Sequence, residues 1–338
     1  MTTEKHSVWG VFAHEWAAEL LARHAANGEV RHAYLFTGPP GAGRRTLALK
    51  LAQAVNCLNP AAPGVPCNAC RACLQLERLQ HPDLSILAPE EGSNTIKVEQ
   101  VRALQHALSL SPYEARYRVA LLLNFEQATI SAQNALLKTL EEAPEKVILL
   151  LTAESAENLL PTIVSRCEVL RLRPASIERL AETLRERWDV PPDEARQLAH
   201  LAGGRPGYAL RLHQEPGLVT QHEDWLADLG MLLAAPLRER LAWVDANHKR
   251  SSRDALRAMF QTWLSFWRDL MLASAGSDAP LTNVDHAADL RALAGRIDFA
   301  TAHARIADLE QAFTRLDANV NARLLLETLL LDWPQIRD

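Results

Sequence analysis

The chain has 338 residues, 48% of them hydrophobic, and a formal net charge of −5 at pH 7. Its length exceeds that of one typical core and predicts about two or three domains. The acidic balance disfavours a chain that holds nucleic acid by itself. No apolar run approaches the roughly eighteen residues of a membrane helix, and Met1-Thr2-Thr3-Glu4-Lys5-His6 shows no signal-peptide pattern. We therefore expect a cytoplasmic protein of several domains.

Up to about residue 172, the sequence alternates between helical patterns and short apolar runs. Continuous apolar runs are typical of strands in a parallel sheet that is covered on both faces. Helices between such strands predict an α/β domain. Strands are expected at 33–37, 84–87, 119–123 and 147–151, and helices at 11–26, 46–55, 98–108 and 156–164. In the first of these helices, one apolar face is formed by Phe12, Trp16, Leu20 and Leu21.

Beyond Pro174 the chain reads as helical. Helices are expected at 177–188 and 193–202, followed by a glycine-rich turn at 203–207 and further helices after about residue 215. We interpret Trp263 and Trp267 as core residues because they lie in an apolar stripe with helical spacing; the alternative is a platform for stacking bases. One last helix is expected to carry Ile306, Leu309, Phe313, Leu316, Leu324, Leu325 and Leu329.

Residues 38–46 read Gly-Pro-Pro-Gly-Ala-Gly-Arg-Arg-Thr, between a predicted strand and a predicted helix. An active phosphate-binding loop has the pattern G-x-x-x-x-G-K-[ST], in which the lysine contacts phosphate and the hydroxyl binds Mg²⁺. Arg44 stands at the lysine position and Arg45 at the hydroxyl position, and Thr46 follows one residue late. The candidate residues of this degenerate nucleotide loop are Gly38, Gly41, Gly43, Arg44, Arg45 and Thr46.

The second element of such an ATPase is an apolar strand that ends in two acids, which hold Mg²⁺ and activate water. Here the strand is present, but the two acid positions hold Leu123 and Asn124, and Glu126 comes two residues late. Both elements that would hold the metal therefore lack their ligands, and we predict no ATP hydrolysis by this chain. Nucleotide binding without hydrolysis stays open, as does the simpler interpretation of a glycine-rich turn.

Four cysteines, Cys57, Cys67, Cys70 and Cys73, are separated by nine, two and two residues. Four thiolates close a tetrahedral Zn²⁺ site, which would be structural because it leaves no open position. Buried or unpaired thiols are the alternative, and His81 is a possible substitute ligand. A zinc-bearing DNA-binding protein is a rival class, which the acidic charge and the lack of a recognition helix disfavour.

Several segments together resemble the AAA+ clamp-loader subunits of bacterial DNA polymerase III. They are 32–41, 134–142, Ser165-Arg166-Cys167 and 319–327. The resemblance implies an α/β AAA+ P-loop-type module at 1–173 with a zinc module at about 57–81, a small helical lid at 174–212 and an all-α collar at 213–338. With its altered loop and acids, the chain is similar to a non-hydrolysing member of that family.

The resemblance also implies partners and a catalytic role. The partners are the gamma/tau ATPase subunits, the delta subunit and, through a hetero-oligomeric ring, the beta sliding clamp and primed DNA. Arg166 would project into the ATP site of a neighbouring subunit. No intrinsic ATPase activity is expected of this chain. As part of the holoenzyme it would be classed with the DNA-directed DNA polymerase, a nucleotidyltransferase. The family's lid arginine corresponds to Gly207 here, with Arg205 displaced. The alternative is an active, gamma/tau-like ATPase subunit.

Overall fold

The computed structural model describes residues 8–90, 95–248, 252–318 and 320–336. The predictions for Met1 to His6 and for Asn319 lie outside these residues. The chain divides into two compact units. The first runs to Ala175 and includes Arg205–Tyr208, and the second comprises Ser176–Gly204 and the chain from Ala209 onward. The division into three domains remains a prediction.

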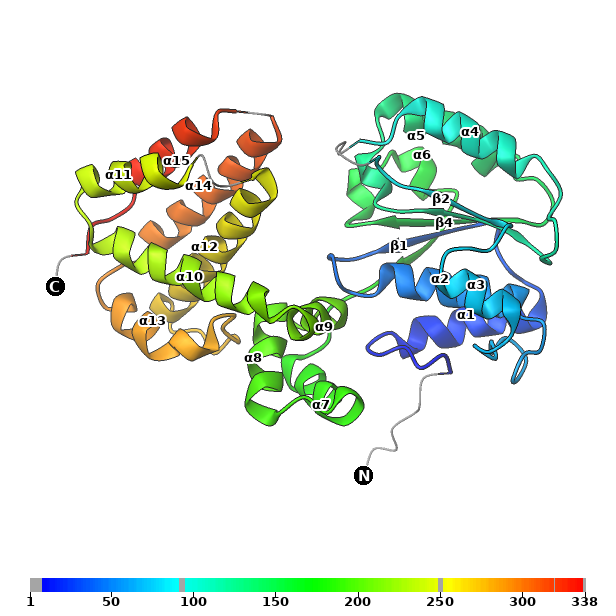
Figure 1. Cartoon of the computed structure of the whole chain (residues 1–338), viewed down its shortest axis with the longest axis horizontal. Coiled ribbons are helices and arrows are strands. Elements are labelled where there is room, and N and C mark those ends of the chain that lie inside the picture. Colours follow the sequence, from blue (N-terminus) through cyan, green and yellow to red (C-terminus); the bar gives the residue numbers. More distant parts are fainter. Residues whose placement is uncertain (1–7, 91–94, 249–251, 319, 337–338) are drawn as a thin grey trace. The chain divides into compact units, whose positions relative to one another are not determined.

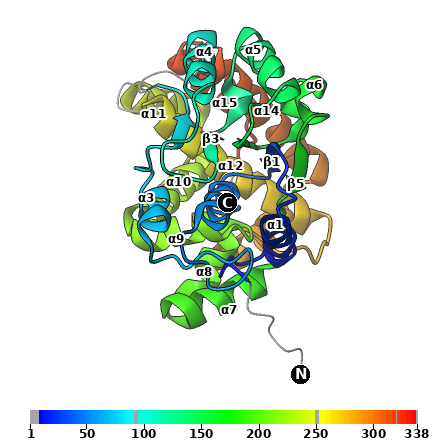
Figure 2. The ribbon, with the colours of Figure 1, turned by 90° about the vertical axis from the view of Figure 1, so that its right-hand side faces the viewer.

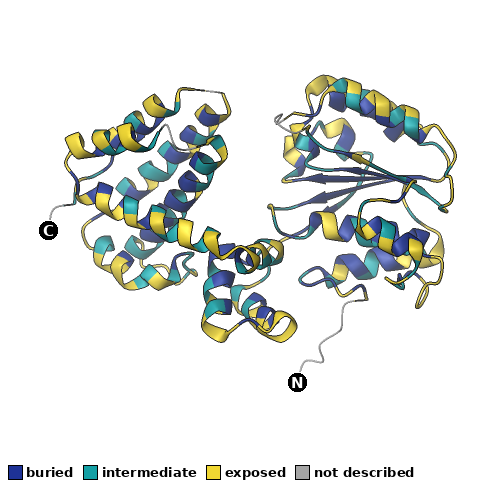
Figure 3. Cartoon of the chain, viewed as in Figure 1, coloured by how far each residue is buried: buried dark blue, intermediate teal, exposed yellow. Residues whose placement is uncertain are grey.

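A five-stranded sheet lies at the centre of the first unit, with the strand order β2-β3-β4-β1-β5. Every neighbouring pair is parallel, and all residues of β1 and β4 are buried, as the dark strands in Figure 3 show. The predicted α/β fold is thereby confirmed. The strands are β1 (Ala33–Thr37), β2 (Leu84–Leu87), β3 (Arg118–Leu122), β4 (Val147–Ala153) and β5 (Glu168–Arg171).

Successive side chains along each strand point to opposite faces of the sheet, where they belong to two separate hydrophobic cores. Tyr34 and Phe36 pack with residues of α1 and α2, whereas Ala33 and Leu35 pack with residues of α4 and α5. Figures 1 and 2 show these helix pairs on opposite faces of the sheet. The helices of this unit are α1 (Glu15–Asn27), α2 (Arg44–Asn56), α3 (Arg71–Glu77), α4 (Val98–Leu108), η1 (Phe125–Gln127), α5 (Ile130–Glu141), η2 (Ala156–Asn158) and α6 (Pro161–Val164).

The regular elements among the described residues of the second unit are all helices, and α12 packs against α10, α13 and α14. Trp263 and Trp267 on α12 are both 0% exposed, which confirms their interpretation as core residues. The helices are α7 (Ile177–Trp188), α8 (Pro192–Ala202), α9 (Pro206–Gln214), α10 (Pro216–Ala234), α11 (Leu237–Asn247), α12 (Arg253–Ser274), η3 (Val284–His286), α13 (Ala287–Ala294), α14 (Phe299–Asp317) and α15 (Ala322–Leu331); α9 begins within Arg205–Tyr208 of the first unit.

Three helix predictions were wrong. The expected last helix is two helices, because the Asn321 side chain accepts the N–H groups of Arg323 and Leu324 and starts α15 afresh. The expected helix at 156–164 is divided into η2 and α6, with a proline as the first residue of α6. The first helix begins at Glu15, and Trp16 is 50% exposed, so it does not belong to the buried face.

A buried arginine joins the ends of two helices in the second unit. Arg240 on α11 is 3% exposed, and burial lowers the pKa of its guanidinium. Carbonyls at the ends of α10 and α15, and two carbonyls that follow α15, accept hydrogen bonds from it; the helix ends suit a cation because their carbonyls carry partial negative charge. These acceptors are Leu232, Leu233, Ala235, Leu330, Trp333 and Pro334, at 2.7 to 3.5 Å.

We expect Arg240→Met to destabilise the second unit by about 3 kcal/mol or more, because it leaves several buried carbonyls without a donor. Chemical denaturation followed by tryptophan fluorescence measures the change, since several tryptophans lie in this unit's core. Arg238→Met is the matched control, because Arg238 is an exposed residue of the same helix. Equal stability of the two variants would contradict this role for Arg240.

Candidate functional site

The degenerate nucleotide loop connects β1 to α2. Gly38, Gly41 and Gly43 all have positive φ, and Gly43 is the N-cap of α2. Arg44 is the first residue of α2 and is buried, whereas Arg45 and Thr46 are exposed. A glycine-rich turn between a strand and a helix is therefore present, as in the phosphate-loop pattern. Arg45, however, stands at the hydroxyl position, and the hydroxyl of Thr46 comes one residue later.

Arg44 is directed towards the end of β3. Its Nη2 donates to Asn124 Oδ1 at 3.2 Å, and its buried Nη1 has no partner among the described residues. Burial lowers the pKa of Arg44, an effect that the nearby carboxylates of Glu126 and Glu154 oppose. Burial also raises the pKa of Glu126. The structure thus brings together the altered lysine position and one of the two altered acid positions, as a guanidinium–amide pair.

The loop is covered by the first turn of α9. Gly207 donates its N–H to the carbonyl of Gly41 at 2.8 Å. A Cβ atom at Gly41 would lie 2.9 Å from the Tyr208 backbone nitrogen, so a larger residue does not fit there. The Arg205 guanidinium lies 4.6 Å from the centre of the Tyr208 ring. At the position where the resemblance places a nucleotide-sensing arginine, this chain has a glycine in main-chain contact with the loop.

Arg166 lies between α6 and β5. Its Nη2 is 2.7 Å from Glu141 Oε1, and its Nη1 donates to the Thr162 carbonyl at 2.9 Å. The Arg166 side chain is 35% exposed, so it remains accessible to a ligand. The next residue, Cys167, packs against the core, and burial raises its pKa to about 12.

The ligand atoms of Cys57, Cys67, Cys70 and Cys73 all lie within 4.8 Å of one another. A tetrahedral zinc with Zn–S bonds of about 2.3 Å separates its sulfurs by about 3.8 Å, and the Sγ atoms of Cys57 and Cys70 are 4.0 Å apart. Backbone N–H groups of Cys67 and Cys70 donate to cluster sulfurs. Burial raises the pKa of Cys70, but hydrogen bonds to its sulfur outweigh it and bring the pKa to about 6. The donor set therefore fits zinc.

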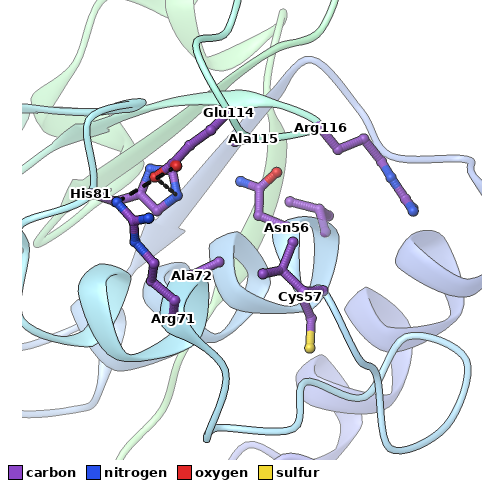
Figure 4. A pocket seen from close by; sticks show the side chains of 10 residues that line it. Asn56, Cys57, Arg71, Ala72, His81, Glu114, Ala115 and Arg116 are labelled. Atoms are coloured by element: carbon purple, nitrogen blue, oxygen red, sulfur yellow. Dashed lines mark ion pairs between the residues drawn. The ribbon is translucent and has the colours of Figure 1, made fainter.

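His81 lies outside this cluster, beside a cavity of about 350 Å³ that Cys57 also lines. Figure 4 shows His81, Glu114 and Arg71 grouped on one side, with the Cys57 sulfur away from them. His81 Nδ1 accepts the N–H of Asp83 at 3.0 Å, and its Nε2 is 3.9 Å from a Glu114 oxygen. Burial lowers the pKa of His81. The structure places His81 beside the ion pair of Arg71 and Glu114 and not with the sulfurs.

Asp83 organises the segment before β3, a role that was not predicted from the sequence. Its carboxylate is 1% exposed and accepts the backbone N–H groups of Tyr113, Glu114 and Ala115 at 2.7 to 2.9 Å. Burial raises its pKa, but these bonds and one from Arg118 outweigh that effect and lower it. A lone aspartate before a strand gives no sequence signal for such contacts.

Two family models match this chain. One, described as DNA polymerase III, delta subunit, matches residues 13–176, and its C-terminal counterpart matches residues 239–335. No helix among the described residues combines the length and apolarity required to span a bilayer.

Two delta-prime subunits agree with these models. The DNA polymerase III subunit delta-prime of Pseudomonas aeruginosa is 32% identical, over 95% of this chain and 97% of its own length. That of Bacillus subtilis is 37% identical over 54% of each chain. A gamma subunit-related protein of Thermotoga maritima has a TM-score of 0.45 at 19% identity, over 93% of this chain and 97% of its own. The resemblance noted in the sequence is confirmed, and the chain belongs to the clamp-loader delta-prime subunit family of DNA polymerase III.

Proposed function

We propose that this chain is a non-hydrolysing subunit of the clamp loader, which supports loading of the sliding clamp onto primed DNA. The observation that carries the proposal is the pairing of Arg44 with Asn124. Two positions that serve Mg²⁺ and phosphate in an active site are joined here by a direct side-chain hydrogen bond. The exposed Arg45 and the contact of Gly207 with Gly41 support the same conclusion.

An ATPase assay of the isolated chain tests this proposal. We expect turnover at the background rate. We also expect no gain from the double variant Arg44→Lys/Arg45→Thr, because Leu123 and Asn124 still offer no carboxylate for Mg²⁺. The control for protein quality is an unchanged melting temperature of the double variant. Sustained hydrolysis by the wild-type chain would favour the active-ATPase alternative.

We propose Arg166 as the catalytic contribution of this chain to a neighbouring subunit. Charge develops on the γ-phosphate oxygens during transfer, and a guanidinium supplied by another subunit stabilises it. Arginine suits this task because its planar fork matches phosphate oxygens and its charge does not titrate near neutral pH. The accessibility of Arg166, 35% exposed, supports the proposal. The neighbours would be the gamma/tau subunits, which hydrolyse ATP, with delta completing the ring.

The four cysteines are proposed to hold a structural Zn²⁺. The metal would supply the fixed point around which residues 57–81 fold, because so short an insert has little core of its own. The insert packs closely against α1, since a Cβ at Gly64 would lie 2.0 Å from the carbonyl oxygen of Ala22. Trp9 Nε1 donates to the Gly64 carbonyl at 2.9 Å. The domains at 1–173, 174–212 and 213–338 and the cytoplasmic location are part of the same proposal.

A further inference from the structure

The C-terminal end of α5 carries two adjacent carboxylates, Glu141 and Glu142. A helix C-terminus bears partial negative charge and disfavours anionic side chains by about 0.3–1 kcal/mol each in exposed positions. Glu141 is half-exposed, and its oxygen lies 2.7 Å from Arg166 Nη2. Its position is therefore unfavourable for the helix alone, and among the described residues its carboxylate forms an ion pair with the arginine that we propose to act on a neighbour.

The hydrogen bonds of Arg166 use some of the donors of its guanidinium and leave others. Nη2 bonds to Glu141, and Nη1 bonds to the Thr162 carbonyl and, at 3.4 Å, to Ser165 Oγ. None of these bonds uses Nε. A guanidinium has five N–H donors, so these three bonds leave others for phosphate oxygens. The arrangement orients the side chain without using up its capacity to donate.

We propose that Glu141 is a positioning residue for Arg166, an inference that rests on the proposed role of Arg166 in a neighbour's ATP site. Thr162 and Ser165 belong to the short segment that leads into Arg166, whereas Glu141 belongs to α5, a helix that covers one face of the sheet. A contact from this second element restricts the rotamers of a long side chain before the partner arrives. Catalytic groups gain from such pre-organisation because less ordering is then required in the transition state.

The pair is also weak enough to be compatible with catalysis. Exposed ion pairs contribute little to stability, because water and salt screen them and two long side chains must be ordered. Glu141 forms a single bond to the guanidinium, and its side chain is 51% exposed. It therefore directs Arg166 while leaving part of the guanidinium exposed.

The experiment uses the reconstituted clamp loader with Glu141→Ala, and measures ATP turnover in the presence of the clamp and primed DNA. At the site that receives Arg166, we expect kcat to fall about three- to tenfold. KM for ATP should not change, because Glu141 does not bind nucleotide. Glu141→Gln should recover part of the loss, because its amide oxygen still accepts the Nη2 hydrogen. Glu142→Ala is the matched control, since no hydrogen bond or ion pair joins Glu142 to Arg166 among the described residues.

A double-variant comparison separates positioning from a general structural role. If Glu141 acts through Arg166, then adding Glu141→Ala to Arg166→Ala causes no further loss. The positioning role is overturned by any of three results. These are an equal loss of kcat in both backgrounds, a kcat for Glu141→Ala that matches that of Glu142→Ala, or a raised kcat. If Arg166→Ala itself has no effect, the proposed function of Arg166 fails first and Glu141 has no role to support. Loss through Arg166→Ala with none through Glu141→Ala refutes the positioning role alone.

Discussion

Replacing Arg166 with alanine should slow hydrolysis at the ATP site that receives it by about 10³-fold or more, the range known for arginine fingers supplied in trans. The loss comes from the transition state, where γ-phosphate charge would lack its guanidinium. Single-turnover hydrolysis by the reconstituted clamp loader measures it, with the sliding clamp and primed DNA present. Total ATP turnover by the complex should fall by the fraction that this one site contributes, and clamp loading should fall with it.

Two further variants show what the site requires. Arg166→Lys keeps the positive charge but lacks the planar fork, so we expect it to recover only a small part of the rate. Arg171→Ala removes an exposed arginine from β5, a few residues away, and should leave hydrolysis unchanged. An Arg166→Ala complex that hydrolyses ATP at every site like the wild type would refute the proposed role.

Removal of zinc should have the second large effect. Structural zinc contributes about 10–16 kcal/mol of apparent binding free energy in small zinc-dependent folds. We therefore expect Cys73→Ser, or treatment with a strong chelator, to unfold residues 57–81 while the sheet persists. Metal analysis should give one zinc per wild-type chain and none in the variant. Limited proteolysis should then cut the insert, which the metal-bound chain protects.

The fifth cysteine supplies the control. Cys167 packs against the core on the α4 and α5 side of the sheet, away from the cluster, so Cys167→Ser should retain its zinc. A wild-type chain that contains no zinc after preparation without chelators, and resists proteolysis in the insert, would show that the four thiols do not serve as a metal site.

The sequence predicted four of the five strands, and the continuous apolar runs of β3 and β4 were the clearest signal. It did not predict β5, whose sequence Glu-Val-Leu-Arg has a charged residue at each end. The cysteine cluster was equally predictable, since the spacing alone brings four sulfurs within reach of one metal. Helix limits were harder to predict. The apolar pattern continues across the break before Ala322, because α14 and α15 pack against the same core. The capping contact of Asn321 marks where the second helix begins.

The contacts within the candidate sites could not be predicted, because they join residues far apart in the chain. The pair of Arg44 and Asn124 depends on how β1 and β3 are placed in the sheet. The contact of Gly207 with Gly41 depends on where the chain returns after α8. Nothing local to Glu141 indicates that Arg166 is its partner. Composition and periodicity describe neighbours along the chain, and these pairs are neighbours only after folding.

The bonds of Arg240 have a consequence for the order in which the chain folds. Two of its acceptors, the carbonyls of Trp333 and Pro334, follow α15 in a segment without regular structure. During translation, the guanidinium on α11 is synthesised more than ninety residues before these carbonyls, as the separations of 93 and 94 positions show. The helical unit can therefore complete its core only after Pro334 has left the ribosome. Any assembly step that requires the completed core would then come after that point.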